Sequence, residues 1–276
     1  MDRYVRYFLR AALAATFPWI AVGSLLYSPA SQSDQSTTLA ALLDQSLDGP
    51  QRSAANRARD AARHPKQTLL FFGLRPNQSV VEIAPGGGWY TEVLAPALRE
   101  RGKLYAMDLP GVDGAETQRM RDAFQKKLAN NPAVFDRVSL DTPPAASADM
   151  VVTFRNIHNW IKAGQLDANL KAFYAMLKPG GVLGVEEHRA PEGTPLERII
   201  ATGYVPESYV ITHARAAGFR LTGHTDINAN KLDDHDHPDG VWSLPPTLRG
   251  GDKDRDLYLT IGESDRMTLR FVKPSR

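Results

Sequence analysis

The chain has 276 residues, enough for one large domain or two small ones, and its hydrophobic (42%) and charged (23%) fractions are ordinary for a globular protein. It contains no cysteine, which excludes disulfides, thiolate–zinc sites and a cysteine nucleophile. The formal net charge is +2, and residues 1–30, with three arginines and one aspartate, account for all of it. A basic face of the kind that binds nucleic acid is therefore not expected.

Residues 1–30 predict export. Three arginines come first, an uncharged apolar stretch covers residues 11–27, and Ser28-Pro29-Ala30 offers the small side chains that a signal peptidase reads. We expect a periplasmic protein with a cleaved signal, or one associated with the inner membrane through residues 1–30; a cytoplasmic location is the alternative. Residues 31–64 are expected to form a linker and N-terminal helices, and residues 65–276 the main domain.

A glycine-rich turn after a short buried strand organises the main domain. A predicted helix over residues 66–72 leads into the apolar strand 80–83, and three consecutive glycines follow, Gly86, Gly87 and Gly88. Residues 89–98 then place apolar side chains at helical spacing. Glycine tolerates positive φ and, without a Cβ, lets a ligand approach the backbone. This arrangement is typical of a nucleotide-binding corner of an α/β sheet, although a corner that binds nothing has the same pattern.

Further strands alternate with helices along the chain. Strands are predicted over residues 103–107, 134–140, 148–154, 182–188 and 219–227, and within residues 257–272 around a turn near 263–265. Helices are predicted over residues 115–128, 166–177 and 206–218. This order predicts an α/β fold with a doubly wound, mostly parallel seven-stranded sheet and an antiparallel C-terminal hairpin. The polar segment 228–255 is long for a loop, which indicates a functional or mobile role.

Acidic residues follow two of the predicted strands. Asp108 ends strand 103–107 and lies 22 residues beyond Gly86, a separation that a crossover helix and two turns fit. We therefore expect Asp108 beside the glycine turn, where a carboxylate can bind both hydroxyls of a ribose. A turn or helix-capping aspartate is the alternative. Asp141 ends the next predicted strand in the same way.

Together these segments resemble class I S-adenosyl-L-methionine (SAM)-dependent methyltransferases. Residues 82–88 are similar to the first motif of that family, Asp108 and Asp141 match the acids after its second and third strands, and residues 177–181 match the turn before its fifth strand. The resemblance is closest to an exported subgroup of bacterial predicted methyltransferases. It implies a Rossmann-like methyltransferase fold for the main domain, SAM as the cofactor and a small-molecule acceptor.

The resemblance also implies a set of cofactor-binding residues: Glu82, Ala84, Pro85, Gly86, Gly87, Gly88, Asp108, Asp141, Phe154, Arg155 and Asn156. In this interpretation the glycine turn passes under the methionine part of the cofactor and Glu82 holds its ammonium group. Asp108 would bind the ribose diol and Asp141 the adenine amino group. Phe154, Arg155 and Asn156 would line the inner wall of the site.

Three residues after the fourth and fifth predicted strands are the candidate catalytic groups: His158, His188 and Glu187. His158 is the first choice for a general base, because acceptor-facing residues commonly follow the fourth strand in the family that the chain resembles; a structural, hydrogen-bonded histidine is the alternative. The run Asp233-Asp234-His235-Asp236-His237 contains metal-ligand residue types. Consecutive residues of a flexible loop seldom complete a coordination shell, so we predict no metal site.

Three functions are consistent with these patterns. The first is SAM-dependent methyl transfer to an unidentified, small-molecule acceptor. The second is a non-catalytic, envelope-associated binding module that retains the fold, because an exported domain would leave the compartment where the cofactor is made. The third, a nicotinamide-dependent oxidoreductase, shares the glycine turn and Asp108, but Thr91 stands where that motif needs its third glycine.

Overall fold

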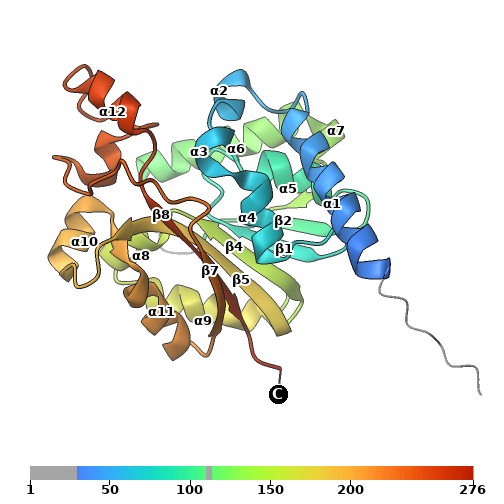
Figure 1. Ribbon diagram of the computed structural model, residues 1–276. Coiled ribbons are helices and arrows are strands. Elements are labelled where there is room, and N and C mark those ends of the chain that lie inside the picture. The colour runs from blue at the N-terminus through green and yellow to red at the C-terminus, as the bar shows by residue number, and fades with distance from the viewer. Residues whose placement is uncertain (1–29, 110–113, 276) are drawn as a thin grey trace, which may run out of the picture.

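The computed structural model describes residues 30–109 and 114–275 (Figure 1). Residues 1–29 lie outside these ranges, so export and membrane anchoring stay predictions. Within the described ranges, no helix is both long enough and apolar enough to cross a membrane.

A mixed sheet forms the centre of the domain (Figure 1). Its main path runs in the order β3 (Val138–Ser139), β2 (Lys103–Met107), β1 (Ser79–Ile83), β4 (Ala148–Phe154), β5 (Leu177–Ala190), β8 (Arg266–Val272) and β7 (Arg220–Thr225), and β6 (Val205–Pro206) pairs with β5. The pairs among β1 to β5 are parallel, whereas β8 is antiparallel to both β5 and β7. The predicted doubly wound, mostly parallel sheet with an antiparallel C-terminal hairpin is confirmed.

Helices cover both faces of the sheet (Figure 1). One hydrophobic layer contains side chains of α8 (Ile157–Lys162), α9 (Leu166–Met176), α10 (Leu196–Thr202) and α11 (Glu207–Ala216). The other contains side chains of α1 (Ala30–Asp48), α4 (Pro65–Phe72), α5 (Thr91–Leu98) and α7 (Pro132–Phe135). The remaining helical segments are α2 (Ala54–Arg57), α3 (Asp60–Arg63), α6 (Ala115–Asn130), η1 (Gly240–Ser243) and α12 (Arg255–Ile261).

Burial of both faces of the sheet explains why β1 is mostly apolar. In β1, Val80 packs into one hydrophobic layer, while Val81 and Ile83 pack into the other. Successive side chains of a strand point to opposite faces, so a strand covered by helices on both sides is apolar at consecutive positions. Leu39 and Leu43 of α1 lie one turn apart and are both buried against the second layer, which docks this N-terminal helix on the domain.

Two predicted strands were wrong over part of their length. Residues 134–140 were expected to be one strand, but α7 occupies Pro132–Phe135 and only Val138–Ser139 pairs with β2. Proline at the first position of a helix is favourable because its fixed φ suits the helix and its missing N–H is not needed there. The segment from Leu257 to Ile261 belongs to helix α12, whose only buried residue is Tyr258.

The connection from β7 to β8 positions the site. The chain leaves β7 at the edge of the sheet and returns in β8, between β5 and β7. His188, near the carboxyl end of β5, is paired with Arg266, the first residue of β8. Residues 226–265 therefore pass over the carboxyl ends of the parallel strands, where open α/β sheets bind their ligands.

Candidate active site

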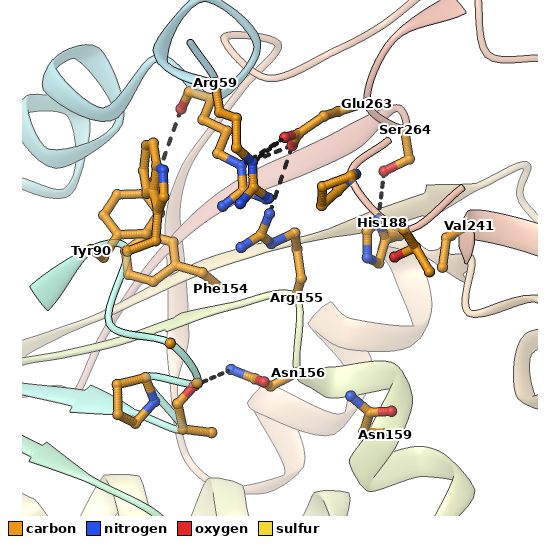
Figure 2. Close-up of a pocket in the computed structure, with 18 of the residues that line it drawn as sticks. Arg59, Tyr90, Phe154, Arg155, Asn156, Asn159, His188, Val241, Glu263 and Ser264 are labelled. Carbon is orange, nitrogen blue, oxygen red and sulfur yellow. Dashed lines mark hydrogen bonds and ion pairs between the residues drawn. The ribbon is translucent and has the colours of Figure 1, made fainter. Parts of the chain in front are cut away.

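A cavity of about 430 Å³ lies at the carboxyl ends of β1, β4 and β5 (Figure 2). The turn after β1 lines it with residues 84–87, and the loop after β4 with residues 154–156 and His158. His188 lines it from the end of β5. The α2–α3 region and the β7–β8 connection complete the wall, so segments from both ends of the chain meet here.

The glycine turn presents bare backbone to this cavity. Ala84, Gly86 and Gly88 all have positive φ (51°, 56° and 76°), a conformation that costs a residue with a Cβ about 1 kcal/mol or more. A Cβ on Gly87 would meet no atom within 4 Å, so the space beside it is open to a ligand. A Cβ on Gly88 would lie 2.6 Å from the Phe124 ring; close packing against α6 therefore requires this glycine, which does not line the cavity.

Asn156 holds the turn in this conformation. Its side-chain nitrogen donates hydrogen bonds to the carbonyl oxygen of Ile83 (3.2 Å) and to Oγ1 of Thr153 (3.0 Å). The peptide N–H of Ala84 donates to the carbonyl of Met107 on β2 (2.9 Å). These contacts tie the turn to both neighbouring strands and compensate for the strained backbone of Ala84.

Glu82 is a buried carboxyl group at the base of the turn. It is 2% exposed, lines the cavity, and accepts a hydrogen bond from the hydroxyl of Thr91 at the start of α5 (2.6 Å). Burial raises the pKa of Glu82 to about 7, although the Thr91 hydrogen bond and the positive charge of Lys127 oppose this rise. The Glu82 carboxyl therefore changes between its neutral and ionised forms near neutral pH.

Asp108 lies on the other side of the glycine turn, in a smaller hollow of about 290 Å³. Pro85 lines both spaces, and Leu109 and Leu140 give the smaller one apolar walls. The Asp108 carboxylate contacts the Arg121 guanidinium at 3.0 Å and is 30% exposed. Asp141, in contrast, is exposed, accepts a hydrogen bond from Ser139, and lines neither space.

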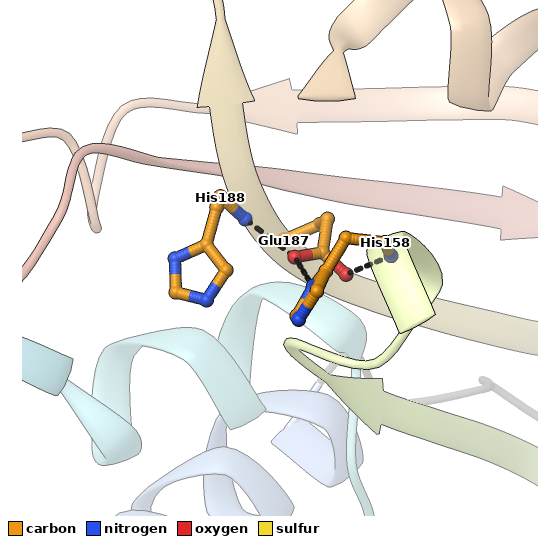
Figure 3. Close-up of side chains that lie close together, drawn as sticks. All are labelled: His158, Glu187 and His188. Atoms are coloured by element: carbon orange, nitrogen blue, oxygen red, sulfur yellow. Dashed lines mark hydrogen bonds and ion pairs between the residues drawn. The ribbon is translucent and has the colours of Figure 1, made fainter. Parts of the chain in front are cut away.

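His158 and Glu187 form a buried hydrogen-bonded pair (Figure 3). Nδ1 of His158 lies 2.9 Å from Oε1 of Glu187. Glu187 is fully buried, and its oxygens also accept the peptide N–H groups of Ile157 (2.5 Å) and His188 (2.8 Å). A carboxylate so placed accepts a hydrogen bond from Nδ1–H and so favours the tautomer with the proton on Nδ1. In this tautomer Nε2 of His158 has a lone pair that can accept a proton. No described residue forms a hydrogen bond with this Nε2.

His188 stays neutral beside this pair. Its ring lies 5.2 Å from that of His158, and its Nδ1 is 2.6 Å from the hydroxyl of Ser264. Burial lowers the pKa of His188 well below its usual value, and the nearby His158, Arg155 and Arg266 act in the same direction. The structure therefore brings all three predicted catalytic residues together, with Glu187 as the partner of His158.

A network of arginines and glutamates forms the upper wall of the cavity (Figure 2). The Glu263 carboxylate accepts hydrogen bonds from Nε of Arg59 (3.0 Å), Nε of Arg63 (2.8 Å) and a terminal nitrogen of Arg266 (2.8 Å). The same nitrogen of Arg266 lies 3.2 Å from Glu186. None of these residues was predicted from the sequence as part of the site.

The β7–β8 connection is held in place by Asp233. This residue is 3% exposed and accepts hydrogen bonds from the Tyr204 hydroxyl (2.8 Å), Nε2 of His237 (2.9 Å) and the peptide N–H of Asp265 (2.7 Å). Two residues of the Asp- and His-rich run, Asp233 and His237, take part in these bonds. The same connection carries Trp242, whose ring packs edge-on against His158 at 5.8 Å.

Comparison with known proteins identifies the family. A family model described as a methyltransferase domain matches residues 54–223, more than half of the chain. The chain belongs to this methyltransferase domain family. It is accordingly a class I SAM-dependent methyltransferase with SAM as its cofactor. A search of curated protein sequences finds no match.

Solved structures support the fold of this methyltransferase. A SAM-dependent methyltransferase from Aquifex aeolicus is 17% identical, with a TM-score of 0.53 over 85% of this chain and 98% of its own. The [4+2]-cyclase SpnF is 16% identical, with a TM-score of 0.55 over 89% of this chain and 96% of its own. At these identities the likeness concerns the fold alone.

The residues around the glycine turn fit the cofactor chemically. The open backbone at Gly87 leaves room for the methionine part of the cofactor. Glu82 can pair with the cofactor's ammonium group, whose positive charge favours the ionised form of this carboxyl. On the other side of the turn, Asp108 can accept hydrogen bonds from a ribose diol, and Leu109 and Leu140 can pack against an adenine ring. The exposed Asp141 is the one predicted adenine contact that the structure leaves outside these spaces.

Arg59, Arg63, Arg266 and the turn 263–265 were missed as site residues because their sequence signals are weak. Residues 52–64 are rich in arginine, which is also typical of a solvated helix. Glu263-Ser264-Asp265 has the composition of an ordinary turn. Only the return of the chain in β8 brings Glu263 to within hydrogen-bonding distance of residues 200 positions earlier.

Proposed function

We propose that the protein transfers a methyl group from SAM to an oxygen atom of a small-molecule acceptor, with His158 as the general base. The observation that carries this proposal is the Glu187–His158 pair at the cavity wall, with its 2.9 Å hydrogen bond and the free Nε2 of the histidine. A hydroxyl group is a weak nucleophile until its proton is removed, so an oriented base in the cavity favours a hydroxyl acceptor.

The chain contributes orientation and proton transfer. The cofactor supplies a methyl group already activated by the sulfonium. Glu187 fixes the Nδ1–H tautomer of His158 and stabilises the imidazolium that forms when Nε2 accepts the acceptor's proton. With SAM bound, the methyl carbon would bond to the acceptor oxygen while its bond to sulfur breaks, so that SAH would be the leaving group and the hydroxyl proton would go to Nε2 of His158. Trp242, Tyr90 and Phe154 line the cavity and restrict the access of water.

Cofactor binding is the first test of this function. Calorimetry should show that the wild-type protein binds SAM and S-adenosyl-L-homocysteine (SAH), but not NAD. Asp108→Asn should weaken SAH binding about ten- to hundredfold, because a charge-assisted hydrogen bond to the ribose is lost. Asp252→Asn, at an exposed position, is the matched control and should bind like the wild type. Failure of the wild-type protein to bind either compound would contradict the proposal.

The affinity for SAH should depend on pH through Glu82. Its pKa of about 7 means that below this pH the carboxyl must lose a proton before it can pair with the ligand's ammonium group. The dissociation constant should therefore increase by up to about tenfold for each pH unit below 7 and level off above it. In Glu82→Gln the profile should be nearly flat between pH 5.5 and 8. A flat profile in the wild-type protein would show that Glu82 does not contact the ammonium.

A further inference from the structure

Four guanidinium groups cluster around two carboxylates at the wall of the cavity. Arg59, Arg63, Arg155 and Arg266 surround only Glu186 and Glu263, so this network has two more positive than negative charges. Arg63 and Arg266 are 1% and 2% exposed, so water does not screen their charges effectively. Burying unpaired charges is costly, which indicates that a bound anion belongs here.

Arg155 shows the imbalance most clearly. Its nearest carboxylate is Glu263 at 3.7 Å, beyond hydrogen-bonding distance, and no described residue accepts a hydrogen bond from its guanidinium. Its backbone has a positive φ of 60°, and its peptide N–H donates to the carbonyl of Glu186 (2.7 Å). Burial lowers the pKa of Arg155, a sign that the cation is incompletely compensated. In Figure 2, its guanidinium and that of Arg59 converge beside Glu263.

Arg59 and Arg63 also have unused donors. Arg59 and Arg63 both approach Glu263 through Nε, and no described residue accepts a hydrogen bond from their terminal amino groups. Arg63 stacks on the Trp89 ring at 4.8 Å, which fixes the plane of its guanidinium. The planar, prearranged donors of three arginines suit a carboxylate or a phosphate.

The cofactor cannot supply the missing negative charge. Its carboxylate and ammonium cancel, and its sulfonium adds one positive charge. Even if Glu82 and Glu187 are counted as ionised, the four glutamates only balance the four arginines. The loaded site therefore keeps at least one uncompensated positive charge, and the remaining component of the reaction is the acceptor.

We propose that the methyl acceptor carries a carboxylate or phosphate group that binds Arg59, Arg63 and Arg155 while its hydroxyl faces His158. This inference rests on the proposed function. Arg155 and His158 line one cavity from the same loop, three positions apart in the chain. An acceptor whose anionic group is bound by the arginines and whose hydroxyl lies beside His158 would have its oxygen aligned for methyl transfer.

Binding of a charged and an uncharged phenol to the SAH-saturated protein tests the inference. 4-Hydroxybenzoate and 4-hydroxybenzamide differ in charge but hardly in shape, and the stacked rings of Tyr90 and Phe154 provide an aromatic wall for either (centroids 3.4 Å apart). Calorimetry on the wild-type protein should give at least about tenfold tighter binding of the benzoate. Inorganic phosphate and acetate, titrated separately, distinguish the two anionic groups.

The preference should disappear in Arg155→Gln and in Arg59→Gln, and Arg59→Gln should keep SAH affinity within about twofold of wild type. Arg59 is partly exposed, so its variant serves if Arg155→Gln folds poorly. Arg220→Gln, at an exposed position of β7, should retain the preference. Tight SAH binding without any preference for anions in the wild-type protein would overturn the inference alone. About tenfold weaker SAH binding by both variants would also overturn it, because the arginines would then hold the cofactor carboxylate. Absence of SAH binding by the wild type would overturn both proposals.

Discussion

Replacing His158 with alanine is expected to lower kcat for methyl transfer by about two to four orders of magnitude. The alanine variant retains the cavity but loses the only described imidazole whose Nδ1 is held by a buried carboxylate, with Nε2 left free to take a proton. SAH affinity should change less than about twofold, because Glu82, Asp108 and the glycine turn, which fit the cofactor, are unchanged in this variant. The measurement is transfer of a labelled methyl group from SAM to the best acceptor among hydroxylated carboxylates and phosphates.

Two further variants separate a catalytic role from a structural one. His224→Ala removes an imidazole whose side chain is 69% exposed on β7, and it should leave kcat unchanged. Glu187 is a positioning residue, so Glu187→Gln should lower kcat and also shift the pH–rate profile, because the imidazolium loses its counter-charge. Wild-type turnover by His158→Ala, with an intact fold by circular dichroism, would remove His158 from the mechanism.

Glu263→Ala should reduce the free energy of unfolding by about 3–5 kcal/mol. Glu263 is 8% exposed and contacts Arg59, Arg63 and Arg266, so the variant would leave the buried Arg63 without a counter-ion and Arg266 with Glu186 alone. The midpoint of urea unfolding measures this loss. Because Arg59 and Arg63 come from the N-terminal region and Arg266 starts β8, Glu263 joins distant parts of the chain.

The control for this prediction is Glu197→Ala, which removes an exposed carboxylate from the first turn of α10 and should change stability by less than about 1 kcal/mol. Glu263→Gln should fall between the two, since an amide can still accept hydrogen bonds but carries no charge. A loss below about 1 kcal/mol in Glu263→Ala would show that the arginines are not held together by this carboxylate.

The strand and helix pattern around the glycine turn could be predicted because its signals are local. Val80, Val81 and Ile83 are apolar, and three glycines follow within five positions, so both the strand and the turn could be predicted. The failure at residues 134–140 has a local cause as well: Pro132 starts a one-turn helix that uses Val134 and Phe135. For residues 257–261, alternating apolar side chains indicated a strand, but with Tyr258 alone buried they form a helical turn.

The candidate site could be predicted only in part. Residues that end parallel strands meet at one edge of a sheet, so Asp108, His158 and Glu187 could be placed near the glycine turn from their positions in the sequence. The pairing of His158 with Glu187 rather than with His188 depends on side-chain directions at the ends of β4 and β5. Those directions, and the division of Asp108 and Glu82 between two spaces, follow from packing.

The sequence by itself determined the alternation of strands and helices, the bare turn after β1 and the acids that follow the strands, because each depends on residues close together in the chain. Only the tertiary structure decided that Arg59, Arg63, Arg155 and Glu263 form one wall of the cavity. These residues come from segments separated by up to about 200 positions, and their contacts exist only because β8 returns between β5 and β7. The physical reason is that ion pairs between residues so far apart in the sequence depend on the order and direction of the strands. A pattern of neighbouring residues does not contain this information.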